Sequence, residues 1–308
     1  MAGRGAFKAL AAGMAGNWRA RPLAKQNQLA YLYRRPRCIL DDFRGRITRE
    51  GIRIYEDADF AGMRTAGRVA AEILDSVSAL VVPGVTTAAI DDFIRAEIAR
   101  HGVTSATIGY KGYQHASCIS VNHVVCHGIP GAKVVVDGDI LNIDVTVIAD
   151  GWFGDTSRMY VAGVASRKAE RLIEVTHEAL IRGIAAVKPG NTFGDIGFAI
   201  QSYAEVNRMS VVRDFCGHGL GRVFHAPPNV LHYGRAGTAA VLEEGMFFTI
   251  EPMVNLGRPE TKVLGDDWTA VTRDKSLSAQ FEHSVGVTAV GCEIFTASPA
   301  GRFHPTRG

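Results

Sequence analysis

The sequence predicts an α+β protein built from two related halves, each with two helices followed by strands. The order helix, helix, strands occurs twice in the 308 residues, and Pro83–Thr86 is matched 106 residues later by Pro189–Thr192. Two such halves would join their strands in one sheet with the helices outside, and a ligand site is expected in a cleft at the seam. Chance similarity between two Pro-Gly-x-Thr loops is the alternative explanation.

The first half contains two predicted helices and three predicted strands. Apolar residues at helical spacing predict a helix over about 57–80, with Asp57 or Asp59 as its N-cap. A second helix is expected to begin at Thr86 and to end at Gly102. Strand-like segments follow at about 117–125, 140–148 and 152–161.

The second half repeats this order. A helix is expected from near Ser166 through Ile184, and Thr192 opens the next one. Strands follow, and two of them are associated with an acid: Glu251 comes directly after Met246–Ile250, and Glu282 lies within Ser278–Thr288.

Composition narrows the class of protein. The chain is 47% apolar and 21% charged, which is typical of a soluble globular protein with a sizeable core. Its apolar runs are all shorter than the roughly 18 residues of a membrane span. The five cysteines form no C-x-x-C pair, which favours reduced thiols in a cytosol-like compartment.

Charge is distributed unevenly along the chain. Residues 1–40 hold eight basic residues and no acid, so the remaining residues carry a net charge of −5. This mildly acidic body gives no support to a nucleic-acid groove. We predict a basic N-terminal extension over 1–46, to be interpreted as a transit peptide, as a disordered bacterial extension, or as sequence upstream of a true start at Met14.

A hairpin is expected to place two acids together. Asp150-Gly151 is a strong two-residue turn signal, and the register that it implies pairs Asp144 with Ser157 and Thr146 with Asp155. Asp144 and Asp155 then lie on the same face of the hairpin as diagonal neighbours. Their backbones would be roughly 7–8 Å apart across the two strands. Two such anions repel, and a bound cation is one usual relief.

Three further residues have metal-ligand chemistry. Glu251 and Glu282 are each the charged member of an otherwise apolar strand, and His218 lies between glycines in Cys216–Gly219. Any one of these acids could lie on a solvated strand face or pair with a base. Together, four acids and one histidine form a hard donor set that suits two ions such as Mn, Fe(II) or Co.

Seven segments combine into a resemblance to type I methionine aminopeptidases: Val125–Pro130, Asn142–Thr146, Gly154–Ser157, Cys216–Gly219, Phe224–His225, Thr249–Met253 and Gln280–His283. The resemblance covers about residues 47–296, which would form the catalytic domain, with 297–308 as a C-terminal tail. It implies the pita-bread fold, in which two pseudo-symmetric α-α-β halves form one curved sheet with outer helices.

The resemblance also implies a role for each site residue. Asp144 would chelate one divalent ion, His218 and Glu251 would bind the other, and Asp155 and Glu282 would bridge both. Glu251 would shuttle a proton, while two histidines would contact the substrate amide. The residues resembling the substrate site are His127, His225, Tyr110, Tyr113, Cys118, Phe224 and Trp268. A monovalent cation is implied at Asn122, Val124 and Ser278.

The implied activity is the removal of an initiator methionine from nascent chains with a small second residue. Such an enzyme would be a cytoplasmic monomer that uses Co, Mn, Fe or Zn, acts near the ribosome and needs no nucleic acid or membrane. It would be an organelle enzyme if residues 1–46 are a transit peptide.

Two alternatives share this fold. An X-Pro dipeptidase or creatinase-like hydrolase would use the same five ligands, but the His127–Pro130 segment and the short chain argue against it. A non-catalytic pita-bread binding protein would typically have lost ligands, and this chain retains all five.

Overall fold

The two predicted halves contain helices of matching length. The structure, a computed structural model, describes residues 45–302. Helices α2 and α4 are each 19 residues long, and α3 and α5 are each 14. Their bounds are α2 (Asp59–Val77), α3 (Thr87–Arg100), α4 (Arg167–Ala185) and α5 (Phe193–Val206). This agreement confirms the predicted repetition of a helix-helix-strands unit.

Three of the four helices begin where the sequence predicts. The hydroxyls of Thr86 and Ser166 accept N–H hydrogen bonds from the first turns of α3 and α4. Thr192 and Asp195 form a reciprocal capping box at the start of α5. Each cap satisfies a backbone donor that would otherwise lack a partner at the helix end.

The start of α2 differs from the prediction. Its N-cap is Ala58, which offers no side-chain oxygen, so neither Asp57 nor Asp59 caps this helix. Asp59 is instead the first helical residue, and its carboxylate accepts a hydrogen bond of 3.0 Å from the Glu56 N–H just outside the helix. A 3-10 turn, η1 (Ser78–Leu80), extends α2 to the end of the predicted range.

The predicted hairpin has the predicted register. Strands β6 (Ile140–Ala149) and β7 (Trp152–Val161) pair Asp144 with Ser157 and Thr146 with Asp155. The turn residue Asp150 has a φ of 49°, a left-handed conformation that aspartate tolerates better than most residues. The turn chemistry therefore fixed the pairing of the two longest strands.

Two predicted strands are each split in two. The segment 117–125 forms β4 (Cys118–Val121) and β5 (Val124–Cys126), because Asn122 turns the backbone with a φ of 56°. The segment 278–288 forms β15 (Ser278–Gln280) and β16 (His283–Val287), which pair with different strands, β12 and β11. Glu282 occupies the second break.

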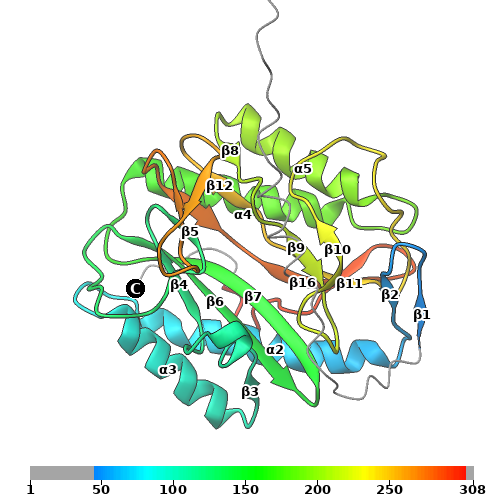
Figure 1. The fold of residues 1–308 in the computed structure, drawn as a ribbon, viewed down its shortest axis with the longest axis horizontal. Coiled ribbons are helices and arrows are strands. Elements are labelled where there is room, and N and C mark those ends of the chain that lie inside the picture. The colour runs from blue at the N-terminus through cyan, green and yellow to red at the C-terminus, as the bar shows by residue number, and fades with distance from the viewer. Residues whose placement is uncertain (1–44, 303–308) are drawn as a thin grey trace, which may run out of the picture. The chain divides into compact units, whose positions relative to one another are not determined.

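Backbone hydrogen bonds divide the strands of residues 45–302 into five groups, and further contacts link strands of the two halves at the seam between them. Ser157 of β7 forms an isolated bridge with Glu282, and the Ser278 N–H donates to the Asn122 carbonyl at 2.9 Å. Figure 1 shows β7 beside β16 at this seam.

The other strands are β1 (Arg46–Ile47), β2 (Arg53–Ile54), β3 (Thr104–Ser105), β8 (Ser210–Val211), β9 (Gly217–Gly219), β10 (Ala226–Val230), β11 (Phe247–Ile250), β12 (Met253–Asn255), β13 (Thr261–Val263), β14 (Ala270–Thr272) and β17 (Cys292–Ile294).

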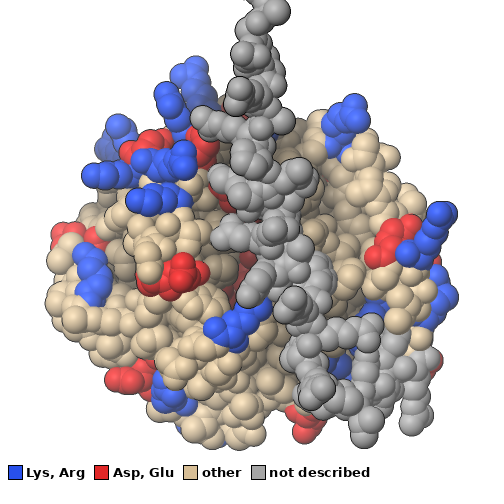
Figure 2. Space-filling model, viewed as in Figure 1, with Lys and Arg blue, Asp and Glu red and all other residues tan. Residues whose placement is uncertain are grey.

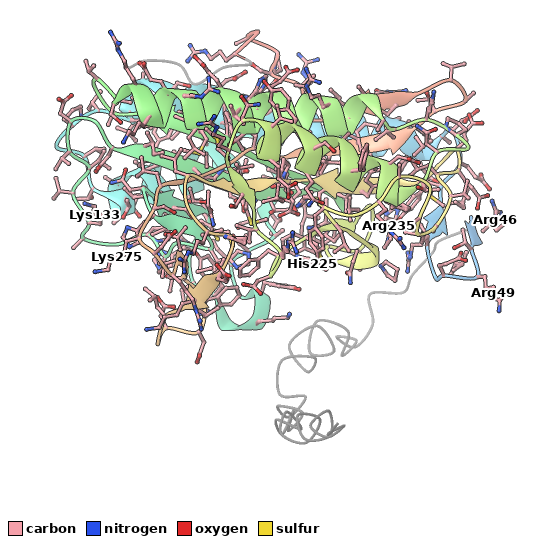
Figure 3. The ribbon with its side chains drawn as sticks, turned by 90° about the horizontal axis from the view of Figure 1, so that it is seen from above. Arg46, Arg49, Lys133, His225, Arg235 and Lys275 are labelled. Carbon is pink, nitrogen blue, oxygen red and sulfur yellow. The ribbon has the colours of Figure 1, made fainter. Side chains whose placement is uncertain are left out.

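The helices pack on one side of the strands and leave the other side to loops. Figure 3 shows α4 and α5 on one side and His225 on the opposite side. Each half has its own apolar core: α2 and α3 pack on β4 and β6, and α4 and α5 pack on β11, β15 and β16. The site residues therefore extend from the face of the strands that the helices do not cover.

The structure describes only part of the predicted N-terminal extension and of the predicted C-terminal tail. The predicted extension over 1–46 lies outside the described residues except for its last two, and 303–308 of the predicted tail also lie outside them. Within the tail, the Ser298 hydroxyl donates to the Asp75 carboxylate of α2 at 2.8 Å. The boundaries at 46 and 296 stay predictions.

Two surface properties complete the description. None of the helices in the described part of the chain is long and apolar enough to cross a membrane. Figure 2 shows lysine and arginine side chains lying close to acidic ones on the visible face, with wide uncharged areas between these groups.

Candidate metal centre and substrate pocket

Three of the five predicted metal ligands converge at the seam. Asp155 of β7, His218 of β9 and Glu282 each place one donor atom within 4.8 Å of the other two. The His218 Nε2 atom lies 3.4 Å from Asp155 Oδ2. All three side chains are buried, so the two acids are withdrawn from water that could solvate their charges.

The local backbone explains how these three residues meet. The Glu282 N–H donates to the Ser157 carbonyl, which fixes Glu282 beside the strand that carries Asp155. A Cβ at Gly219 would lie 2.1 Å from the Pro227 carbonyl oxygen, so only glycine allows β10 to approach β9 beside His218. The Thr146 hydroxyl donates to Asp155 Oδ1 at 2.7 Å and orients that carboxylate.

Glu251 lies next to the three-residue cluster. Its Oε1 atom is 3.8 Å from His218 Nε2 and accepts a hydrogen bond of 2.9 Å from the Thr249 hydroxyl. Its Oε2 atom accepts a 3.3 Å hydrogen bond from the Gln280 amide. The carboxylate is thus held from two sides with its first oxygen toward His218.

Asp144 is the least connected of the five. It faces Ser157 across the β6–β7 ladder and Cys118 across the β4–β6 ladder. Burial raises the pKa of Asp144 well above its usual range, and the charges of Asp155 and Glu251 raise it further. In the register of this ladder, Asp144 is a diagonal neighbour of Asp155.

The pKa values of Glu282, Glu251 and His218 are consistent with crowded negative charge. Burial raises the pKa of Glu282 well above normal, and Asp155, Glu251 and Asp144 add to this. Burial also raises the pKa of Glu251, to about 7. Burial lowers the pKa of His218, but the Asp155 hydrogen bond and the Glu251 charge outweigh this and raise it overall. A cation between these groups would relieve the repulsion.

The donor set fits a divalent metal. Among residues 45–302, no lysine or arginine forms an ion pair with any of the four acids, and His218 is the basic side chain that reaches them. Carboxylate oxygens and one imidazole nitrogen are ligands that Mn, Fe(II) and Co accept readily. The converging buried acids are therefore better explained by bound cations than by a structural ion-pair network.

Three predicted substrate residues adjoin the metal ligands. The His225 ring centre lies 4.1 Å from that of His218, and the Phe224 ring centre lies 6.0 Å from it. The Tyr110 hydroxyl and His225 Nδ1 are hydrogen-bonded at 3.0 Å, and the Tyr110 ring packs against Phe224 at 5.0 Å. These contacts place three predicted residues in one group beside the metal ligand His218.

The other predicted substrate residues form a second group. Trp268 packs against Tyr113, with ring centres 4.8 Å apart, and against His127 at 6.2 Å. Burial raises the pKa of the Cys118 thiol, and the neighbouring Asp144 charge raises it further, which links this group to the metal ligands. Phe215, which the sequence analysis missed, packs edge-on against His127 at 5.6 Å.

His127 and His225 are half-buried, and their surroundings favour the uncharged imidazole. Burial lowers the pKa of His127 to about 4 and that of His225 well below its usual value. In each case the positive charge of Lys111 contributes to the lowering. Neutral imidazoles can donate one N–H to a substrate carbonyl without carrying a permanent charge.

The three residues predicted for a monovalent cation lie at the strand junction. The Asn122 carbonyl accepts the Ser278 N–H at 2.9 Å, and Val124 begins β5 beside this contact. The Asn122 amide is already bonded to Asp139 and to the Ile140 N–H. A cation at this junction stays a prediction.

Two buried residues near Glu251 were given no role in the sequence analysis. The His232 Nε2 atom accepts the Glu251 N–H at 3.0 Å, while its Nδ1 atom has no hydrogen-bond partner. Gln280 Oε1 is likewise without a partner. The sequence carried little signal for His232, because its contact with Glu251 joins residues 19 positions apart.

Comparisons with known proteins agree with this geometry. Residues 61–289 match the model of metallopeptidase family M24. A methionine aminopeptidase of Rickettsia prowazekii is 55% identical over 255 residues, covering 82% of this chain and 98% of that protein. A crystal structure of methionine aminopeptidase from the same organism has a TM-score of 0.79 at 56% identity, covering 80% of this chain and 99% of the other. For a methionine aminopeptidase structure from Thermotoga maritima, the TM-score is 0.78 at 39% identity, with 80% and 99% covered. The chain therefore belongs to metallopeptidase family M24 and, within it, to the type I methionine aminopeptidases.

Proposed function

We propose that this enzyme hydrolyses the peptide bond after the N-terminal methionine of nascent proteins and peptides with a small second residue. The observation that carries the proposal is the buried convergence of Asp155, His218 and Glu282, with Glu251 beside them and no lysine or arginine of residues 45–302 paired with the acids. The similarity to methionine aminopeptidases extends over most of this chain and most of each relative. This favours methionine removal over X-Pro dipeptide hydrolysis.

We assign two divalent ions to the site. Asp144 would hold one ion, His218 and Glu251 the other, and Asp155 and Glu282 would contact both. When bound, such ions activate water and polarise the carbonyl of the bond to be cleaved. Their identity, whether Co, Mn, Fe or Zn, is a matter for elemental analysis.

The other side chains would bind and orient the substrate. Glu251 would carry a proton at its carboxylate, which Thr249 and Gln280 hold in place. His225 and His127 would donate N–H groups to the substrate amide, where charge develops in the transition state. A Tyr110 hydroxyl that donates to His225 Nδ1 leaves the ring proton on Nε2, free for the substrate.

The aromatic groups would enclose the methionine side chain. Tyr110 and Phe224 form one wall, and Tyr113 and Trp268 form another near Cys118. A thioether packs favourably against aromatic rings, with about 0.3–1.5 kcal/mol per contact. Asn122, Val124 and Ser278 would hold a monovalent ion that steadies the strand junction.

The cellular setting follows from this role. The enzyme would act in the cytoplasm as a monomer on chains emerging from the ribosome. Subcellular fractionation and light scattering test these two statements. Mass spectrometry of the native N-terminus would show whether residues 1–46 are removed.

A direct assay tests the reaction. The purified protein loaded with Mn or Co should release methionine from Met-Ala-Ser, should leave Leu-Pro intact, and should lose activity with a chelator. Glu251→Ala should lose nearly all turnover while retaining the fold, as judged by circular dichroism. Cleavage of Leu-Pro in place of Met-Ala-Ser would contradict the proposal and favour an X-Pro dipeptidase.

A further inference from the structure

Lys111 is a cation beside the predicted substrate residues. Its ammonium nitrogen lies 5.2 Å from the centre of the Tyr110 ring. Tyr110 in turn stacks on His225, with ring centres 5.3 Å apart, and its hydroxyl is hydrogen-bonded to the same histidine. Lys111 is therefore separated from a predicted substrate-binding histidine by one aromatic ring.

The charge of Lys111 is not neutralised by the protein. Within residues 45–302, no acidic side chain pairs with it, and its contact is with the face of Tyr110. Partial burial lowers the pKa of the Lys111 ammonium, whereas its positive charge reaches far enough to lower the pKa values of His127 and His225. A positive charge of this kind, beside a pocket, attracts anionic ligands.

A well-connected turn holds Lys111 in this place. It is the central residue of η2 (Tyr110–Gly112) and adopts a left-handed φ of 49°. The Gly109 N–H donates to the Tyr113 carbonyl at 2.7 Å, and the Tyr113 N–H donates back to Tyr110 at 2.9 Å. Tyr113 is anchored by its hydroxyl to the Ser117 carbonyl at 2.9 Å. The side chain of Lys111 is exposed, so the core does not require it.

We propose, on the basis of the proposed function, that Lys111 binds a carboxylate in the part of the substrate that follows the scissile bond. The enzyme would then favour peptides with an acidic third residue. With the N-terminal methionine among the aromatic residues and the scissile amide at His127 and His225, the chain beyond that amide would leave past Lys111, which lies on the Tyr110 ring that stacks on His225. An extended peptide advances about 3.3–3.6 Å per residue, so a third-residue side chain comes within reach of a lysine. The free C-terminal carboxylate of a dipeptide offers the same chemistry.

The expected preference is modest. The pair would be partly exposed, and exposed ion pairs contribute little because water screens them. We expect an acidic third residue to raise kcat/KM about two- to fivefold at low ionic strength, with the advantage shrinking in high salt. The effect should be in KM, because the ion pair forms equally in the bound substrate and in the transition state.

The test compares two amidated peptides, Met-Ala-Glu-Ser-amide and Met-Ala-Gln-Ser-amide, on the full-length, metal-loaded enzyme. Lys111→Asn removes the charge while suiting the left-handed backbone, and Lys111→Arg keeps the charge. Lys275→Asn is the matched control, because Lys275 is also left-handed, with a φ of 63°, and Figure 3 shows it far from His225. Met-Ala and Met-Ala-amide form a second pair that separates a C-terminal carboxylate from a side-chain one.

The wild type, Lys111→Arg and Lys275→Asn should prefer the Glu peptide, whereas Lys111→Asn should lose this preference and cleave the two peptides with equal kcat/KM. Equal rates in the wild type, or an unchanged preference in Lys111→Asn, would overturn the inference. A preference for Met-Ala over Met-Ala-amide with none for Glu would overturn the third-residue assignment. If the neutral Gln peptide releases no methionine from any variant, the proposed function itself fails, and the inference with it.

Discussion

Two hydroxyl groups tie the predicted bridging acids together across the seam, and their removal is a demanding test of this geometry. The Thr156 hydroxyl donates to the Glu282 carbonyl at 2.7 Å, and the Ser284 hydroxyl donates to the Asp155 carbonyl at 2.6 Å. The Asp155 N–H also donates to Ser284 Oγ at 3.3 Å. The strand that carries Asp155 therefore holds the backbone of Glu282, and the strand that follows Glu282 holds the backbone of Asp155.

Thr156→Val replaces the hydroxyl by a methyl group of similar size in a site that is 2% exposed. The Glu282 carbonyl then loses its buried donor, which costs about 1–3 kcal/mol. For a domain of this size, a loss of about 2 kcal/mol lowers the melting temperature by about 4–8 °C. Ser284→Ala should cost as much, and the double variant should cost less than the sum, because each strand positions the other.

Urea unfolding of the metal-free protein measures these losses as free energies. Thr176→Val is the control, since this threonine is also fully buried and donates to the Leu172 carbonyl at 2.7 Å. That carbonyl already accepts the helical N–H of Thr176, so losing the hydroxyl should cost under about 1 kcal/mol. Equal losses for Thr156→Val and Thr176→Val would refute the reasoning about the seam.

Three further predictions concern the metal, a close contact and a helix cap. Chelation should lower the melting temperature, and Mn at 100 times its dissociation constant should restore about 2.7 kcal/mol, as read from dye-monitored melting. Gly154→Ala places a Cβ 2.2 Å from the Ala66 carbonyl and should cost about 1–3 kcal/mol in urea unfolding, whereas Gly131→Ala, with open space at its Cβ, should cost far less. The Thr192 N–H and hydroxyl lower the pKa of Asp195, so its stabilisation is present above the ordinary aspartate pKa and is lost as the pH falls through the lowered value. Asp195→Asn should therefore reduce the loss of stability below about pH 4 in pH-dependent melting.

Local chemistry made several parts of the fold predictable. The left-handed Asp150 and Gly151 close a two-residue turn, which fixes the whole ladder between β6 and β7. The caps at Thr86, Ser166 and Thr192 are equally local, since each hydroxyl bonds within its own first helical turn. Such features depend on neighbours in sequence, and pattern reasoning captures them.

The two strand predictions that were wrong lie where contacts between residues distant in sequence determine the structure. The strand breaks at Asn122 and Glu282 are set by partners in the other half, since Asn122 accepts from Ser278 and Glu282 pairs with Ser157. The sequence pattern could suggest Asp144 and Asp155 as neighbours, because a hairpin joins them. It could not bring His218 to Asp155, 63 positions away, without the family resemblance.

The seam also explains why this site needs both halves. Asp155 comes from the hairpin of the first half, whereas His218 and Glu282 come from the second, and their donor atoms meet within 4.8 Å. Neither half could hold the three donors alone, and closing the seam brings buried acids together at an electrostatic cost. The hydroxyls of Thr156 and Ser284 offset part of that cost in the metal-free protein, and bound cations would offset the rest. The same contacts that bring the two halves together thus bring together the groups that would bind the metals.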